Sequence, residues 1–100
     1  MLKKRGGARR PMTQPDYAAA HKHSFKNREE VLASEVCGCF YCLAVFPPSE
    51  IRSWCDEVAG VGLTAICPRC SVDSVIGAAS KLPMSAAFLR AMKRKWFDSG

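Results

Sequence analysis

Apolar residues follow a helical pattern most clearly near the end of the chain. Four of them recur at helical spacing, with Phe97 beside them: Phe88, Leu89, Met92 and Trp96. Ser85 precedes this run and is a good N-cap residue, so the pattern predicts a helix over about residues 86–97. Aromatic side chains at helical spacing in a small domain are more often core than surface. We therefore expect Trp96 and Phe97, and also Trp54, in the core.

The first half of the chain predicts one short helix and one strand. Asn27, followed three residues later by Glu30, fits a capping box, in which the two side chains bond the free backbone N–H groups of a helix start. A helix is therefore expected from residue 28 to about residue 35. Residues 43–46 are apolar and stop at two prolines, as a short strand would.

The second half predicts further short elements. Residues 49–54 suggest one or two helical turns, and residues 63–66 suggest a strand that pairs with residues 43–46 as a hairpin. After residue 70, Ser71 or Asp73 could cap another helix. That helix would end at Gly77 and hold three apolar residues: Val72, Val75 and Ile76.

Charge divides the chain into two parts. The net charge is +6 over 100 residues, but residues 1–28 hold eight Lys or Arg and one acid (+7), whereas residues 29–100 hold seven and eight (−1). The first stretch also has few large apolar residues, so it has little to bury. We expect residues 1–22 to be a flexible basic arm and residues 23–100 to be the folded domain.

The cysteines suggest metal rather than disulfides. No apolar run approaches the length of a membrane span, and the basic start is followed by glycine, arginine and proline instead of a signal-peptide core. We therefore expect a cytoplasmic protein with no membrane association, in which the six cysteines stay reduced. Paired spacings of reduced cysteines are typical of zinc sites.

Two C-x-x-C pairs carry the metal prediction. Each such turn points two thiolates at one ion, and zinc in structural sites takes four ligands. The candidate ligands are Cys39, Cys42, Cys67 and Cys70, which would hold one structural Zn²⁺. Since the first pair is preceded by Cys37, the set with Cys37 in place of Cys39 remains an alternative. An iron–sulfur cluster also takes four cysteines and is a second alternative.

Other chemistry finds less support. Cys55 stands alone and is expected to fill space as a small apolar residue. A hydrolytic zinc site keeps one position open and uses histidine or carboxylate ligands, yet residues 43–66 and 71–100 contain no histidine. His21 and His23, the only histidines, lie beside the basic arm and are expected in solvent. Arg69 is expected in solvent near the thiolates.

From about His23 to Phe97 the chain resembles a family of short, uncharacterised bacterial proteins described as cytoplasmic proteins. The matching residues are Asn27, residues 34–42, residues 48–51, Trp54, residues 64–70, residues 73–77, Phe88, Leu89, Met92, Trp96 and Phe97. Ser71 stands where this family commonly has glycine. The resemblance implies a cytoplasmic metal-binding module and no particular activity.

The sequence as a whole predicts a small, single α+β zinc domain of treble-clef or zinc-ribbon type, with a short β-hairpin and flanking helices. As function we expect a non-enzymatic binding module that contacts nucleic acid, or an acidic protein, through its basic arm and the basic face of the last helix. The alternatives are a protein-binding regulatory adaptor and, ranked last, a zinc-dependent hydrolase or nuclease. We do not expect a small-molecule substrate.

Overall fold

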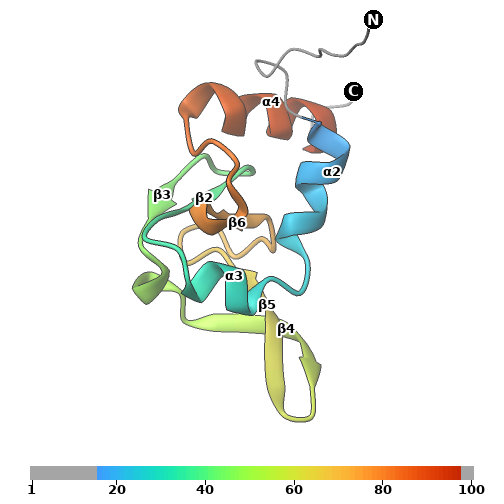
Figure 1. The fold of residues 1–100 in the computed structure, drawn as a ribbon, viewed down its shortest axis with the longest axis vertical. Helices are drawn as coiled ribbons and strands as arrows, with labels where there is room; N and C mark the ends of the chain where they lie inside the picture. Colours follow the sequence, from blue (N-terminus) through green and yellow to red (C-terminus); the bar gives the residue numbers. More distant parts are fainter. Residues whose placement is uncertain (1–15, 98–100) are drawn as a thin grey trace, which may run out of the picture.

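Residues 16–97 are the part of the chain that the structure, a computed structural model, describes (Figure 1). Its helices are α2 (Tyr17–His21), α3 (Arg28–Leu32) and α4 (Ala86–Phe97), with 3₁₀ turns η1 (Lys22–Ser24), η2 (Pro48–Glu50) and η3 (Ala78–Ser80). The strands are β2 (Cys37–Cys39), β3 (Val45–Phe46), β4 (Ser53–Val58), β5 (Val61–Ile66) and β6 (Val75–Gly77). This combination confirms the predicted α+β class.

A three-stranded antiparallel sheet in the order β3-β2-β6 forms the centre. Cys37 of β2 lies opposite Phe46 of β3 on one side and opposite Gly77 of β6 on the other. Cys39 lies opposite Val75. Because β2 and β6 are far apart in the sequence, their pairing brings the two cysteine turns together.

Strands β4 and β5 form a separate hairpin that projects from the globule at the end opposite α4 (Figure 1). Its two-residue turn is Ala59-Gly60, with φ of 54° and 85°, as type I′ turns require. Arg28 of α3 holds the hairpin in place. Its Nη1 donates to the Gly62 carbonyl oxygen at 2.8 Å, and its guanidinium carbon lies 4.6 Å from the centroid of the Trp54 ring.

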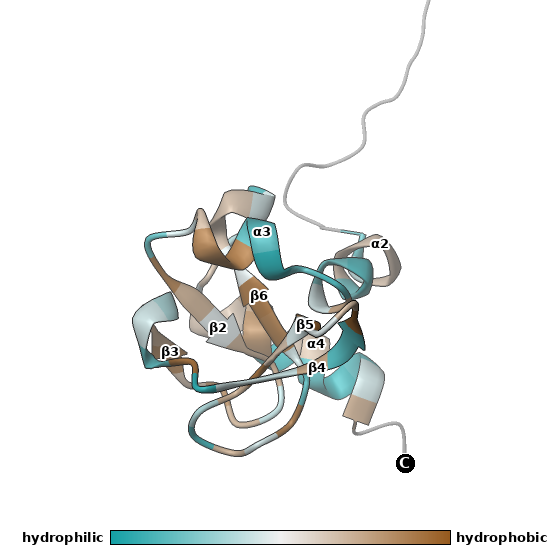
Figure 2. Ribbon diagram, turned by 90° about the horizontal axis from the view of Figure 1, so that it is seen from below, coloured by the Kyte–Doolittle hydropathy of each residue, from teal (hydrophilic) through white to brown (hydrophobic). Residues whose placement is uncertain are grey.

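Buried side chains form two clusters. The cysteine-side cluster comprises Val31, Cys37, Cys39, Phe46, Ala65, Cys67 and Val75. The helix-side cluster comprises Ala20, Phe40, Ile76, Phe88, Leu89 and Met92. Since successive residues of a strand point to opposite faces, Val75 belongs to the first cluster and Ile76 to the second. In Figure 2, β3 and β6 are coloured as hydrophobic.

The buried amide of Asn27 ties several of these elements together. Its Nδ2 donates to the carbonyl oxygens of His23 and Val75, both at 2.8 Å, and the backbone N–H of Ala65 donates to its Oδ1 at 3.1 Å. The predicted capping box is therefore wrong. Asn27 precedes α3 but makes no capping hydrogen bond, because its amide is used by strands β5 and β6, and Glu30 contacts His23 Nδ1 at 2.8 Å instead.

The predicted hairpin between residues 43–46 and 63–66 is also wrong. β3 pairs with β2, and β5 pairs with β4. The helical turns expected over residues 49–54 shrink to η2, after which β4 begins at Ser53. Pairing β4 with β5 closes only a two-residue loop, which costs less chain entropy than the longer loop of the predicted hairpin.

The helix predicted after the second cysteine pair is replaced by β6, whose three residues are all buried. A strand buried on both faces shows no alternation, so periodicity alone does not distinguish it from a buried helix. This arrangement departs from a treble clef, in which a helix follows the second pair. The C-terminal helix is confirmed, and the Ser85 hydroxyl caps it by accepting from the Phe88 N–H at 3.1 Å.

The folded part begins earlier than the predicted boundary at residue 23. Asp16 caps α2 by accepting from the N–H groups of Ala18 and Ala19, both at 3.1 Å, and Ala20 is buried in the helix-side cluster. Residues 17–21 therefore belong to the globule, because this small apolar stretch finds a partner in α4. Residues 1–15 lie outside the described residues, so the basic arm stays a prediction there. Within residues 16–97, no helix has the length and apolar character to cross a membrane.

Candidate metal centre

The first cysteine pair lies in the tight turn between β2 and β3. The N–H of Cys39 donates to the Ala44 carbonyl oxygen, and the N–H of Leu43 donates to the Cys39 carbonyl oxygen, both at 2.9 Å. Leu43, directly after Cys42, has φ of 69°. The N–H of Tyr41 donates to Cys39 Sγ at 3.4 Å. The turn thus points backbone N–H groups at its own sulfur.

The second pair lies in an equivalent turn between β5 and β6. The N–H of Cys67 donates to the Val72 carbonyl oxygen, and the N–H of Ser71 to the Cys67 carbonyl oxygen, both at 3.0 Å. The N–H of Arg69 donates to Cys67 Sγ at 3.3 Å, and Ser71 has φ of 69°. Spacing, hydrogen bonds and backbone conformation are therefore repeated, and each turn presents its two thiols in the same way.

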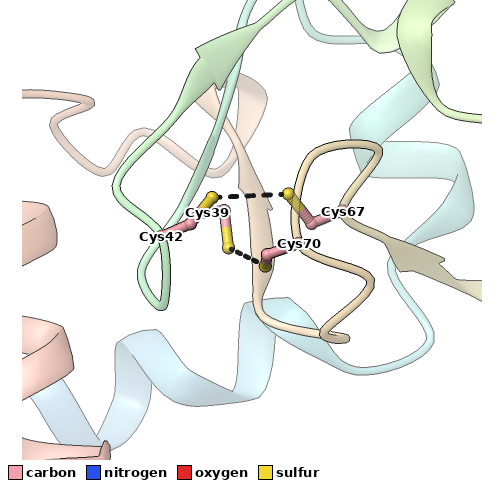
Figure 3. A group of neighbouring side chains, drawn as sticks. All are labelled: Cys39, Cys42, Cys67 and Cys70. Carbon is pink, nitrogen blue, oxygen red and sulfur yellow. Dashed lines mark hydrogen bonds between the residues drawn. The ribbon is translucent and has the colours of Figure 1, made fainter.

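The two turns bring four sulfurs together (Figure 3). All Sγ atoms of Cys39, Cys42, Cys67 and Cys70 lie within 4.8 Å of one another. Cys39 Sγ lies 3.6 Å from Cys70 Sγ, and Cys42 Sγ lies 3.7 Å from Cys67 Sγ, so each short contact joins one turn to the other. These are the four predicted ligands, and the cluster could bind a metal ion.

The two shortest contacts between the turns match the edge of a tetrahedral site for a single ion. A disulfide would need about 2.05 Å between sulfurs. Zinc with four sulfurs at about 2.3 Å gives a tetrahedron whose edges are about 3.8 Å. The observed 3.6 and 3.7 Å agree with that edge. A cluster of several iron atoms bridged by sulfide needs its ligands farther apart than a single ion does.

Hydrogen bonds prepare Cys39 for ionisation. Burial of the thiol opposes the thiolate, but the Ser74 hydroxyl at 3.2 Å and the backbone N–H groups of Cys42 and Tyr41 outweigh it, so the pKa of Cys39 is lowered. Ser74 is itself buried. Its hydroxyl therefore has little access to water, and the sulfur is its natural partner.

The second pair behaves differently. Burial raises the pKa of Cys67, against the hydrogen bonds from the N–H groups of Arg69 and Cys70. Burial also raises the pKa of Cys70, where the nearby Cys39 sulfur adds to the effect. These thiols need a cation to become thiolates, so metal binding at this site must release protons.

Cys37 is outside the cluster. It lies two residues before Cys39 in β2, which is about 6.6 Å along a strand, and it packs with Phe46 in the cysteine-side cluster. Burial raises the pKa of its thiol to about 11, so it is a neutral side chain. The geometry favours the set with Cys39 over the alternative with Cys37. Cys55 lies in β4, half-buried and also outside the cluster.

The side chains of Arg69 and of both histidines have protein partners. Arg69 is exposed, as predicted, and its Nη2 and Nε donate to Glu50 Oε1 at 2.9 and 3.3 Å. The expectation that both histidines lie free in solvent is wrong, because each has a protein partner. His23 pairs with Glu30, and His21 lies against Trp96 with 4.2 Å between the ring centroids.

Sequence reasoning missed an exposed aromatic surface. Trp96 and Phe97 were expected in the core, but their exposed fractions are 37% and 43%. Met92 and Leu89 on the same stripe are fully buried, so the stripe continues past the edge of the core that covers it. Tyr41, between the first two ligands, is 40% exposed. The available signal in the sequence was the length of the apolar stripe, which exceeds what the thin core of a chain of this size can cover.

No family model matches the chain, and neither a curated protein nor a solved structure matches it. The resemblance to bacterial cytoplasmic proteins therefore stays a prediction.

Proposed function

We propose that Cys39, Cys42, Cys67 and Cys70 bind one Zn²⁺ as four thiolates. The observation that carries this proposal is the meeting of four sulfurs from two equivalent turns, at separations suited to a tetrahedral ion. A set of four sulfurs is a common zinc ligand set in structural sites. Four thiolates with Zn²⁺ carry a formal charge of −2, which the N–H and hydroxyl donors around the sulfurs moderate.

The role of this ion is structural. Four sulfurs close the coordination sphere, which leaves no position for a reacting water. The carboxylate of Glu50 is held by Arg69, which lies between Cys67 and Cys70. In this chain no histidine lies in residues 43–66 or 71–100, where a base for hydrolysis would be expected. These facts support a binding module over a hydrolase or nuclease.

The ion also supplies stability that the small core lacks. It joins the β2–β3 turn to the β5–β6 turn, and structural zinc contributes roughly 10–16 kcal/mol, comparable with the whole stability of a small domain. Stripping the metal with a chelator should therefore unfold the domain, as followed by far-UV circular dichroism. Cys70→Ala should lose the metal, and Cys55→Ala is the matched control that should keep it. Unchanged spectra after chelation would contradict the structural role.

We further infer a nucleic-acid partner in the reducing cytoplasm. Residues 1–15 hold five Lys or Arg and no acid, and residues 86–97, the helix α4, hold four and no acid. The acids of residues 16–85 lie outside α4. Segments with a net positive charge attract phosphate, whereas a metal site with a formal charge of −2 does not.

A salt series tests this partner. The zinc-loaded protein should bind labelled RNA or DNA at about 50 mM salt and lose affinity steeply as salt rises, because each neutralised phosphate releases a counterion. Changing the five basic residues of 1–15 to Gln should flatten the slope. Changing Arg52, Arg69 and Lys81 to Gln is the control and should leave it unchanged. Absence of binding at 50 mM salt would remove the nucleic-acid proposal.

An adaptor role has one observation in its favour. An open groove of about 670 Å³ runs beside α3 and β5, and its lining includes the exposed apolar side chains of Phe25 and Leu32, 55% and 53% exposed. A peptide could lie there. This second function would be favoured by two results together: the parent protein binds a partner protein but no nucleic acid, and the double variant Phe25→Ala, Leu32→Ala no longer binds that partner.

A further inference from the structure

Five aromatic rings form a continuous strip that joins α4, α2 and the first cysteine turn. In order they are Trp96, His21, Phe40, Phe97 and Tyr41. Neighbouring ring centroids are 4.2, 5.9, 5.7 and 4.9 Å apart along this order. The helix and the metal turn therefore share one aromatic surface, which we call the aromatic strip.

Three members of the aromatic strip reach solvent. Tyr41, Trp96 and Phe97 are 40%, 37% and 43% exposed, whereas Phe40, which contacts Phe97 and His21, is buried. Aromatic side chains gain much from burial, so three half-exposed rings in one contiguous strip indicate a surface that a partner covers.

Cations flank the exposed rings. Lys93 Nζ lies 5.2 Å from the centroid of Tyr41, and Lys95 Nζ lies 5.2 Å from that of Trp96. Arg90 and Arg94 stand on the same helix, and both are exposed. A partner that covers the rings must also accept this positive charge, as a phosphate backbone does.

We propose that the aromatic strip binds single-stranded nucleic acid, with bases stacking on Tyr41, Phe97 and Trp96 while Lys93 and Lys95 contact the phosphates. Stacking on exposed rings requires bases that are free of a duplex, and it tolerates any base because each has a π-face. This inference rests on the proposed nucleic-acid function and specifies its substrate class. An acidic protein is the competing partner.

The metal turn sets the position of one ring. Tyr41 lies between two ligands, and its N–H donates to Cys39 Sγ at 3.4 Å. Its ring meets Phe97 edge-on, at an interplanar angle of 74°. The aromatic strip is therefore complete only when the first cysteine turn has its folded shape, which couples zinc binding to nucleic-acid binding.

Fluorescence anisotropy with labelled 15-nucleotide strands and a 15-base-pair duplex tests the proposal on the zinc-loaded full chain. Single strands should bind more tightly than the duplex. Phe97→Leu keeps apolar bulk but removes the ring, and it should weaken single-strand binding by at least about 5-fold, the lower end for loss of one stacked base. Phe25→Leu, at an exposed phenylalanine outside the aromatic strip (55% exposed, against 43% for Phe97), is the control and should bind nucleic acid as the parent does.

The salt dependence separates stacking from charge. Phe97→Leu should leave the slope of log affinity against log salt unchanged. Lys93→Gln with Lys95→Gln should reduce that slope by about 0.7 for each lost phosphate contact. The metal content and circular dichroism spectrum of every variant must match those of the parent. Phe97→Trp, which restores an aromatic ring, should recover the affinity that Phe97→Leu loses if stacking is the cause.

The outcomes distinguish this inference from the function on which it rests. If the parent binds neither strand nor duplex, both fail. If it binds strand and duplex equally, and Phe97→Leu has no effect while the charge changes in residues 1–15 abolish binding, the nucleic-acid function stands and the aromatic strip is overturned. Binding of an acidic protein that Phe97→Leu abolishes, without any binding of nucleic acid, would assign the aromatic strip to that protein.

Discussion

Replacement of Asn27 tests how the strands are held to the N-terminal part of the fold. Its side chain is almost fully buried, with 4% exposed, and it joins η1, β5 and β6 through three hydrogen bonds. A capping role would need only a short oxygen near the start of α3, so serine would serve as well as asparagine. The observed role needs an amide, because two donors and one acceptor must reach three backbone groups.

The magnitude follows from those bonds. Each hydrogen bond contributes about 1 kcal/mol net, so Asn27→Ser and Asn27→Ala should each lower the free energy of unfolding by about 3 kcal/mol. Loss of the amide also leaves the Val75 carbonyl and the Ala65 N–H buried without partners, which adds to the cost. Asn27→Asp should be at least as harmful, because a carboxylate would face the carbonyl oxygens of His23 and Val75.

The assay is urea unfolding of the zinc-loaded variants at equal metal content, followed by circular dichroism. Glu29→Ala, an exposed change in the same helix, is the control and should alter the free energy of unfolding by less than about 0.5 kcal/mol. If Asn27→Ser also stays within about 0.5 kcal/mol of the parent, the residue acts as a cap and the reasoning from its three bonds is refuted.

Four further substitutions test the site and the hairpin. Cys37→Ala should keep one metal ion per chain, whereas Cys39→Ala should lose it, as elemental analysis will show; equal loss in both would implicate Cys37 as a ligand. Ser71→Gly should raise the free energy of unfolding by about 0.5–1 kcal/mol. At φ of 69° the backbone strain of a residue with a Cβ exceeds the entropy that glycine loses on folding. A lower unfolding midpoint in urea would refute this. Gly62→Ala should lower the free energy of unfolding by about 1–3 kcal/mol, because the added Cβ would lie 2.5 Å from Trp54 Cβ. An unchanged melting temperature would show that this close contact is absent.

The sequence was most informative where chemistry is local. The spacing of each cysteine pair determines a turn, so the four residues that meet were predictable before their geometry was known. Ser85 and the apolar stripe likewise predicted α4, because capping and helical periodicity depend on neighbouring residues.

Pairing between distant segments could not be predicted in the same way. Val75 and Ile76 are apolar in either a helix or a doubly buried strand, and only their pairing with β2 decides between the two. The amide of Asn27 suits a helix cap locally, yet the strands claim it. Trp96 fell outside the core for a related reason, because the extent of a core depends on which elements pack together.

The most direct test of the central claim is an X-ray absorption spectrum of the metal in protein purified without added zinc. The account predicts a zinc edge and four sulfur neighbours at about 2.3 Å, with no nitrogen or oxygen neighbour in the first coordination shell. An iron edge, a mixed sulfur and nitrogen shell, or the absence of any bound metal would contradict it.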